Sequence, residues 1–166
     1  MNPTPNDFWR DRRVFVTGAT GMIGHWLVRG LLAAGARVAA LVRDPDPQSD
    51  FYRSGDYRRT SLVHGRLEDW ATLERALNEY EVDTVFHLAA QPIVSVAQRW
   101  PLATFEANIR GTYHLLEACR IYARLVKRVV IASSDKAYGT HAALPYTEDM
   151  RSEEHTSELQ SRGLIS

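Results

Sequence analysis

Cysteine is nearly absent from this chain, since Cys119 is the only one among 166 residues. A single thiol excludes an intramolecular disulfide framework and a cysteine-based zinc cluster, and no metal site is expected. Net charge is absent as well, because 20 Lys and Arg balance 20 Asp and Glu. A chain without net charge has no general attraction for a nucleic-acid backbone or an anionic membrane. Partners must therefore be argued from individual sites.

Long apolar runs are also missing. No stretch approaches the roughly 20 apolar residues that cross a bilayer, and the first residues, MNPTP, lack the basic and apolar regions of a signal peptide. We therefore expect a cytoplasmic protein without a membrane partner. Hydrophobic residues make up 45% of the chain and charged residues 24%, which is typical of a folded globular domain.

Short β-rich runs alternate with helical patterns from residue 12 onward. Strands are predicted at residues 13–17, 37–42, 61–64, 84–88 and 128–132. Helices are predicted from residue 22 to Gly35, around 70–80 and over 101–123, the last with one helical stripe made of Phe105, Ile109, Thr112, Leu116 and Cys119. This alternation predicts an α/β fold, a Rossmann-type doubly wound parallel sheet with strand order 3-2-1-4-5.

A glycine turn joins the first strand to the first long helix. Gly18, Gly21 and Gly24 have the spacing G-x-x-G-x-x-G, in which the first glycine permits a tight turn, the second lets a pyrophosphate approach the backbone, and the third lets helix and strand pack closely. Such a pattern alone is weak and also fits a turn that serves packing only. A strand before it and a helix after it favour dinucleotide binding at the helix N-terminus.

The end of the second strand bears on the choice between NAD and NADP. Arg43 would accommodate the 2'-phosphate of NADP, whereas Asp44 could accept a hydrogen bond from a ribose hydroxyl. Arg43 favours NADP, although a solvated strand-end arginine is the plainer interpretation. Both cofactors stay open at this point.

Four motifs together resemble the extended short-chain dehydrogenase/reductase family, also known as the NAD-dependent epimerase/dehydratase family. They are the glycine turn after Thr17, the segment HLAAQ at 87–91, the segment NIRGT at 108–112 and the segment SSDKAYG at 133–139. Within the family, the resemblance is greatest to sugar-nucleotide 4,6-dehydratases that act on CDP-glucose or GDP-mannose. It implies a tightly bound, recycled NAD or NADP, a nucleotide-sugar substrate and a homodimer.

The resemblance also implies roles for individual residues. Ser134 would hydrogen-bond the sugar's C4 oxygen, Asp135 would be the acid and Lys136 the base for water elimination. Many relatives carry Glu where Lys136 stands, and a solvated turn pair is the plainer interpretation of these two charges. The expected cofactor contacts are Gly18, Thr20, Gly21, Met22, Ile23, Gly24, Arg43, Leu67, Ala89, Ala90 and Asn108.

Two other functions remain open. A 4-epimerase or reductase of the same family would need the glycine turn but not an acid and base at Asp135 and Lys136. A non-catalytic NAD(P)-binding module would also account for the absence of the family's Y-x-x-x-K pair, because Tyr138 and Tyr146 are followed four residues later by Ala142 and Met150.

The last segment differs in character from the rest. The residues RSEEHTSELQS at 151–161 resemble the translation of a common DNA sequencing-library adapter. We therefore expect a flexible lead at 1–11, an incomplete NAD(P)-binding domain at 12–149 and a non-native tail at 150–166. The chain would then be an inactive N-terminal fragment of an active lyase that has a further substrate domain.

Overall fold

The computed structural model describes residues 5–134, 138 and 145–147. The chain divides into two compact units, Met1–Ile131 and Ala132–Ser166. The first unit contains all the helices and strands named below.

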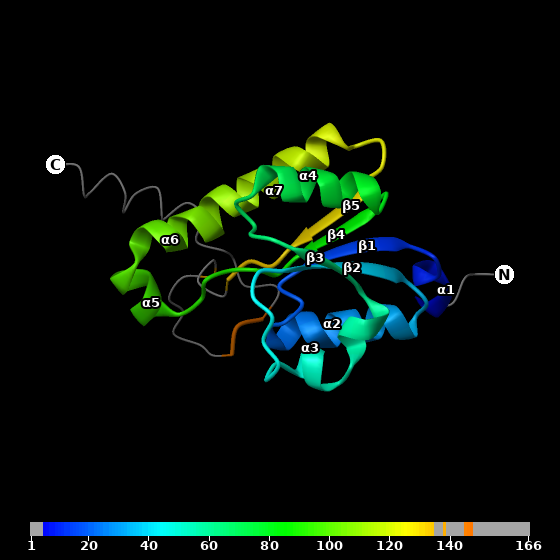
Figure 1. The fold of residues 1–166 in the computed structure, drawn as a ribbon, viewed down its shortest axis with the longest axis horizontal. Coiled ribbons are helices and arrows are strands. Elements are labelled where there is room, and N and C mark those ends of the chain that lie inside the picture. The colour runs from blue at the N-terminus through cyan, green and yellow to red at the C-terminus, as the bar shows by residue number, and fades with distance from the viewer. Residues whose placement is uncertain (1–4, 135–137, 139–144, 148–166) are drawn as a thin grey trace. The chain divides into compact units, whose positions relative to one another are not determined.

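The first unit is built on a five-stranded parallel sheet (Figure 1). Its strands are β1 (Arg13–Thr17), β2 (Arg37–Val42), β3 (Ser61–His64), β4 (Thr84–His87) and β5 (Arg128–Ile131). Their order is β3-β2-β1-β4-β5, and β1 lies between β2 and β4 with Phe15 opposite both Ala39 and Val85. The predicted fold class and strand order are confirmed.

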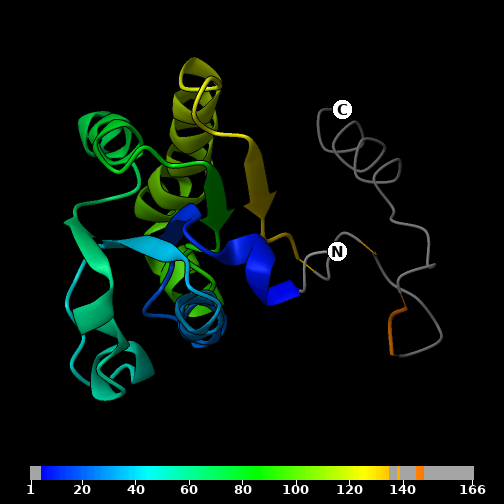
Figure 2. The same cartoon turned by 90° about the vertical axis from the view of Figure 1, so that its right-hand side faces the viewer.

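Helices cover both faces of this sheet, as the two perpendicular views show (Figures 1 and 2). One face carries α2 (Met22–Ala33), α3 (Asp50–Arg53) and the 3-10 turn Asp56–Arg59, and the other carries α4 (Trp70–Glu79) and α7 (Gly111–Ile121). Successive strand residues point to opposite faces. Val14 and Val16 therefore belong to the core under α2, while Phe15 belongs to the core under α4 and α7.

The segment expected to be a flexible lead includes helix α1 (Pro5–Trp9). The ring of Trp9 lies 5.8 Å from that of Phe86 and packs on the core under α2. Helix α2 ends where the glycine predicted it, because Gly35 has φ +83° and Ala36 N–H donates to the carbonyl of Leu31 at 2.9 Å.

The predicted helix over 101–123 is irregular, and its stripe is buried at Cys119 but exposed at Phe105, Ile109 and Leu116. Helices α5 (Val94–Arg99) and α6 (Pro101–Phe105) are followed by a π-helical turn, Glu106–Arg110, that leads into α7. Phe105 and Ile109 are both 58% exposed, and Leu116 is 39% exposed. A π turn takes more residues than an α turn, so a spacing of 3.6 does not carry across it. The residues that α7 buries are Gly111, Leu115, Ala118 and Cys119.

Cys119, the lone cysteine, packs inside the domain. It is 6% exposed, and burial raises the pKa of its thiol to about 11.

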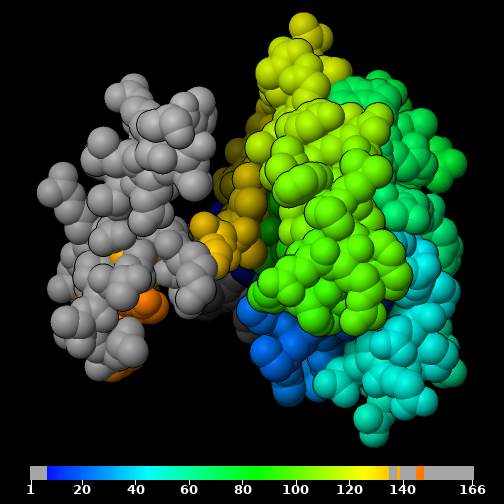
Figure 3. Space-filling view, turned by 90° about the vertical axis from the view of Figure 1, so that its left-hand side faces the viewer, coloured from blue at the N-terminus to red at the C-terminus, as the bar shows by residue number. Residues whose placement is uncertain are grey.

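The exposed apolar side chains of the segment from α5 to α7 belong to the broad green and yellow surface in Figure 3. In the part of the chain that the structure describes, no helix combines the length and apolarity that a membrane crossing requires.

Candidate functional site

A hollow of about 410 Å³ lies at the carboxyl ends of the strands. It is lined by Gly18, Thr20, Gly21, Leu41, Arg43, Asp44, Asp46, Leu67, Glu68, Leu88, Ala89, Ala90, Gln91, Pro92 and Ala107. The chain runs outward from β1 to β3 and then returns to the other side of β1 for β4. Doubly wound sheets bind ligands where the strand order reverses in this way.

Seven of the eleven predicted cofactor contacts line this hollow, namely Gly18, Thr20, Gly21, Arg43, Leu67, Ala89 and Ala90. The lining also includes residues that the sequence did not single out. Asp46 and Glu68 belong to polar connections without a motif, so only the fold brings them to the hollow. Leu67 is 7% exposed and packs against Gly111, where an added Cβ would lie 2.6 Å from Leu67 Cγ.

The first and third glycines of the turn are required by the protein itself. Gly18 has φ +80°, and a Cβ there would lie 2.8 Å from Ala89 N. A Cβ on Gly24 would lie 2.0 Å from Gly18 O. The turn thus folds back on itself and packs against the peptide between Leu88 and Ala89, which leaves no room for a side chain at either position.

The second glycine is different, because the protein leaves space beside it. A Cβ on Gly21 would meet only Gly18 O, at 3.3 Å. Gly21 is the N-cap residue of α2, and no side-chain cap bond is made there. The first hydrogen bond within the helix runs from His25 N–H to Gly21 O at 2.9 Å.

Met22 and Ile23 lie in the first turn of α2 and would contact a ligand through their backbone and not through their side chains. Their side chains are 78% and 67% exposed and do not line the hollow. In the first turn of a helix the N–H groups have no acceptor within the helix, and the helix dipole adds partial positive charge. What Met22, Ile23 and Gly24 offer is therefore backbone N–H groups suited to an anion such as a pyrophosphate.

Charged side chains gather at the end of the hollow beyond β2 and β3. Arg43 Nε donates to Asp44 Oδ2 at 2.6 Å. Arg66 donates to Glu68, whose pKa is raised by burial but lowered more by its hydrogen bonds and by Arg66, so that it lies below its usual value. Of the residues that line the hollow, Arg43 is the cation, and Asp44, Asp46 and Glu68 are carboxylates.

Asn108 holds a residue of the hollow's wall, Gln91, through two hydrogen bonds. Its Oδ1 accepts from Gln91 N–H at 2.7 Å, and its Nδ2 donates to Gln91 O at 3.1 Å. Asn108 lies in the π-helical turn and is not among the lining residues. The structure thus makes it a support for Gln91.

Of the three predicted catalytic residues, the structure describes only Ser134. Ser134 is described and exposed, three residues after the end of β5, and Asp135 and Lys136 lie outside the described residues. Their roles stay predictions. In the same unit the rings of Tyr138 and Tyr146 stack with centroids 5.4 Å apart. The described residues contain no group of three side chains that could hold a metal ion.

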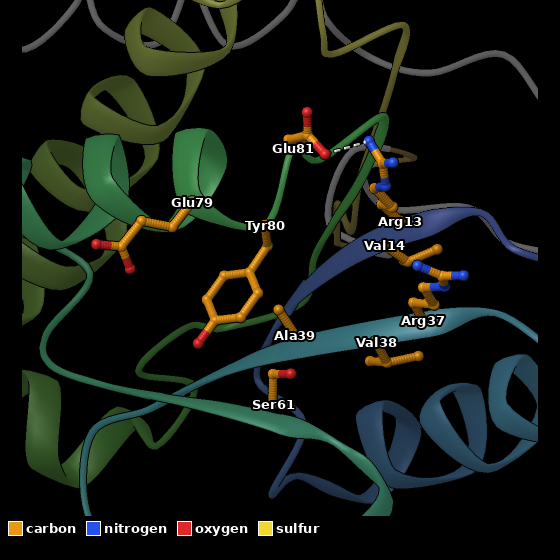
Figure 4. A pocket seen from close by; sticks show the side chains of 9 residues that line it. All are labelled: Arg13, Val14, Arg37, Val38, Ala39, Ser61, Glu79, Tyr80 and Glu81. Carbon is orange, nitrogen blue, oxygen red and sulfur yellow. Dashed lines mark ion pairs between the residues drawn. The ribbon is translucent and has the colours of Figure 1, made fainter.

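A second hollow of about 250 Å³ lies at the opposite edge of the sheet (Figure 4). Arg13 and Arg37 begin β1 and β2 there, Arg13 pairs with Glu81 at 2.7 Å, and the Tyr80 ring lies over Ala39 and Ser61. Open α/β sheets bind ligands at the carboxyl ends of their strands. The amino-end hollow is therefore not our candidate site.

Comparison with known proteins agrees with this geometry. Residues 15–157 match the family model described as GDP-mannose 4,6 dehydratase. The chain is 36% identical to CDP-glucose 4,6-dehydratase from Salmonella typhimurium, over 80% of this chain and 37% of that protein. It is 39% identical to a GDP-mannose 4,6-dehydratase from Sordaria araneosa, over 86% of this chain and 26% of that protein.

Solved structures of the same fold include enzymes that hold NAD. A UDP-glucose 4-epimerase from Thermus thermophilus in complex with NAD superposes with a TM-score of 0.69 at 32% identity, over 91% of this chain and 51% of that one. A UDP-glucose 4-epimerase from Stenotrophomonas maltophila with bound NAD gives 0.72 at 26%, over 92% and 49%. The chain spans well under two thirds of the length of the curated relatives named above. The family match and these identities show that the chain belongs to the GDP-mannose 4,6 dehydratase family, within the NAD-dependent epimerase/dehydratase proteins.

Proposed function

We propose that this chain is the cofactor-binding part of an NAD-dependent sugar-nucleotide 4,6-dehydratase. The observation that carries the proposal is the uncapped end of α2 beside Gly21, at the edge of the sheet where the strand order reverses. A dinucleotide fits this arrangement, because the pyrophosphate needs backbone N–H groups and a residue without a side chain. A hollow of about 410 Å³ also falls within the usual size of ligand sites.

The charges at the end of the hollow favour NAD over NADP. Arg43 is already engaged by Asp44, and three carboxylates line the hollow against one arginine. A ribose 2'-hydroxyl can donate to a carboxylate, whereas a 2'-phosphate would be repelled by it. The sequence favoured NADP because of Arg43, whereas the pairing of Arg43 with Asp44 and the excess of carboxylates favour NAD.

NADH is accordingly expected to bind the chain about tenfold more tightly than NADPH, a difference of about 1.4 kcal/mol. Fluorescence titration of the chain with each reduced cofactor measures the ratio. The variant Asp44→Asn should narrow the ratio, because it removes one repelling charge and releases Arg43. Tighter binding of NADPH by the unaltered chain would mean that Arg43 holds a 2'-phosphate after all.

The chemistry proposed for the full-length protein is water elimination from a nucleotide hexose. The nicotinamide, when bound, supplies transient oxidation at sugar C4 and returns the hydride at C6. Ser134 hydrogen-bonds the C4 oxygen, whose hydroxyl proton goes to the Tyr of the Y-x-x-x-K pair proposed for the full-length protein. Asp135 protonates the departing 6-hydroxyl, and Lys136 takes the proton from C5 and returns it to C5 when the hydride reaches C6. A carboxyl and an amine in adjacent positions suit this work if their surroundings keep one protonated and the other neutral.

Alanine in place of Asp135 or Lys136 is therefore expected to reduce dehydratase turnover of the full-length protein by about 100-fold or more. Release of a 4-keto-6-deoxy sugar nucleotide measures this turnover. Cofactor titration of each variant serves as the control and should be unchanged. Dehydratase turnover within about threefold of the unaltered enzyme would remove both residues from the mechanism.

A 4-epimerase is the second candidate, because several relatives at about 30% identity carry that name. An epimerase should keep most of its turnover without Asp135 and Lys136. A non-catalytic NAD(P)-binding module is the third candidate. Sequencing the locus past codon 150 tests it, because a reading frame that continues into Y-x-x-x-K would exclude a module without the catalytic pair. The same sequence tests whether residues 150–166 are native.

We also propose that the full-length protein is a homodimer. The apolar side chains that the helical segment leaves exposed are available to a second copy, among them Phe105, Ile109, Tyr113 and Leu116. A cytoplasmic location stays a prediction.

A further inference from the structure

A buried histidine lies behind one wall of the cofactor hollow. His87 ends β4 and is 4% exposed. Its Nδ1 lies 2.7 Å from Thr17 Oγ1 at the end of β1, and its Nε2 lies 2.9 Å from Thr112 Oγ1 on α7. The imidazole is therefore held between the strand that leads into the glycine turn and the helix that follows the π-helical turn.

The partners of the two threonines determine where each proton lies. Thr112 Oγ1 is 2.7 Å from the carbonyl oxygen of Asn108, which can only accept, and Thr17 Oγ1 is 3.2 Å from Ala89 N–H, which can only donate. For a neutral imidazole, only one arrangement satisfies all four hydrogen bonds. The Thr112 hydroxyl donates to Asn108, His87 Nε2–H donates to Thr112, and the Thr17 hydroxyl donates to Nδ1. Burial lowers the pKa of His87 and so favours the neutral ring, which in this arrangement is the Nε2–H tautomer.

We infer that His87 is a positioning residue for the cofactor wall, acting through Thr17 and Thr112. One end of this hydrogen-bonded chain fixes the Ala89 amide, whose nitrogen would lie 2.8 Å from a Cβ on Gly18. The other end fixes the backbone of Asn108, whose side chain holds Gln91. Ala89 and Gln91 both line the hollow, whereas His87 and Thr112 do not. The tautomer of a buried imidazole thus sets two points of one wall.

The inference rests on the proposed function, since the wall matters only if the hollow takes a dinucleotide. The isosteric change Thr112→Val removes the acceptor for Nε2–H without changing the shape of the side chain, and Thr112→Ser keeps the hydroxyl. Thr17→Val and Thr17→Ser form the same pair at the other end. Val85→Ala, on the same strand and fully buried, is the control for loss of stability without loss of a hydrogen bond.

The experiment is NADH titration of the chain and its variants, together with the ring nitrogen resonances of His87 by NMR. Each valine variant is expected to weaken NADH binding roughly 3- to 10-fold, as linked groups in one network do. The serine variants and Val85→Ala should stay within about twofold. Because both threonines act through one imidazole, the double valine variant should bind little worse than either single variant. The unaltered chain should show His87 as the Nε2–H tautomer.

Three results would overturn the inference. If the fold loss of NADH affinity in the double valine variant equalled the product of the two single losses, the two hydroxyls would act independently. Equal weakening by Val85→Ala would reduce the network to general stability, and an Nδ1–H tautomer would contradict the hydrogen-bond assignment. Absence of NADH binding by the unaltered, folded chain would instead defeat the proposed function, and the tautomer measurement would still report on the hydrogen bonds.

Discussion

Replacing Gly24 with alanine is expected to leave the chain unfolded. The added Cβ would lie 2.0 Å from Gly18 O, 2.7 Å from Gly18 C and 3.0 Å from Ala19 Cα. All three are backbone atoms of the turn, so no side chain can rotate away, and either β1 or α2 must move. A cost above about 4 kcal/mol is expected for such an overlap, which is comparable to the net stability of a small domain. Far-UV circular dichroism during urea unfolding measures the loss.

The same helix offers a matched control for this variant. Gly30 also lies within α2, but a Cβ there would meet nothing within 4 Å. Gly30→Ala should therefore stabilise the chain by about 0.5–1 kcal/mol, because alanine loses less entropy in a helix. If Gly24→Ala unfolded at the same urea concentration as the unaltered chain, the turn would not have the geometry described above.

Replacing Gly21 with alanine should leave the chain folded but greatly weaken its binding of NADH, in contrast to the replacement of Gly24. Gly21 has φ −78° and ψ 167°, a conformation open to alanine, and its Cβ would meet only Gly18 O at 3.3 Å. We expect a stability cost of about 1 kcal/mol, since alanine is a poorer N-cap than glycine. The methyl group would occupy the space through which a pyrophosphate reaches the N–H groups of α2, so NADH affinity should fall by about 100-fold, or about 2.7 kcal/mol.

NADH titration and urea unfolding of Gly21→Ala test both parts of this expectation. Gly30→Ala is again the control, because it should bind NADH like the unaltered chain. Binding of NADH within about threefold of normal by Gly21→Ala would show that nothing approaches the backbone at this glycine. The two glycine variants thus separate a residue that the fold needs from one that the ligand needs.

Much of the fold follows from the sequence because strand and helix periods alternate cleanly up to β5. The strand order and the glycine that terminates α2, Gly35, were both predicted correctly. The segment 101–123 was predicted as one continuous helix, whereas the structure interrupts it with a π-helical turn before Gly111 that no local pattern indicates. Phe105 and Ile109 lie on the surface, in a stretch where neither α6 nor the π-helical turn buries a residue.

The site was predictable to the extent that backbone conformation and motif position determine it. Glycine spacing indicates a turn, but it does not reveal that Gly24 faces Gly18 whereas Gly21 faces open space. Glu68 and Asp46 reach the hollow only through the packing of distant segments. His87 lies within a recognised motif, yet its function depends on Thr17 and Thr112, which are 70 and 25 residues away.

The most direct test of the central claim is where NADH perturbs the backbone amides of the chain. Two-dimensional ¹H–¹⁵N spectra recorded during titration report this residue by residue. The account predicts the largest shifts at Gly21, Met22, Ile23 and Gly24, with smaller ones at Ala89 and Gln91. Shifts that cluster instead around Arg13, Tyr80 and Glu81, at the amino-end hollow, would contradict it.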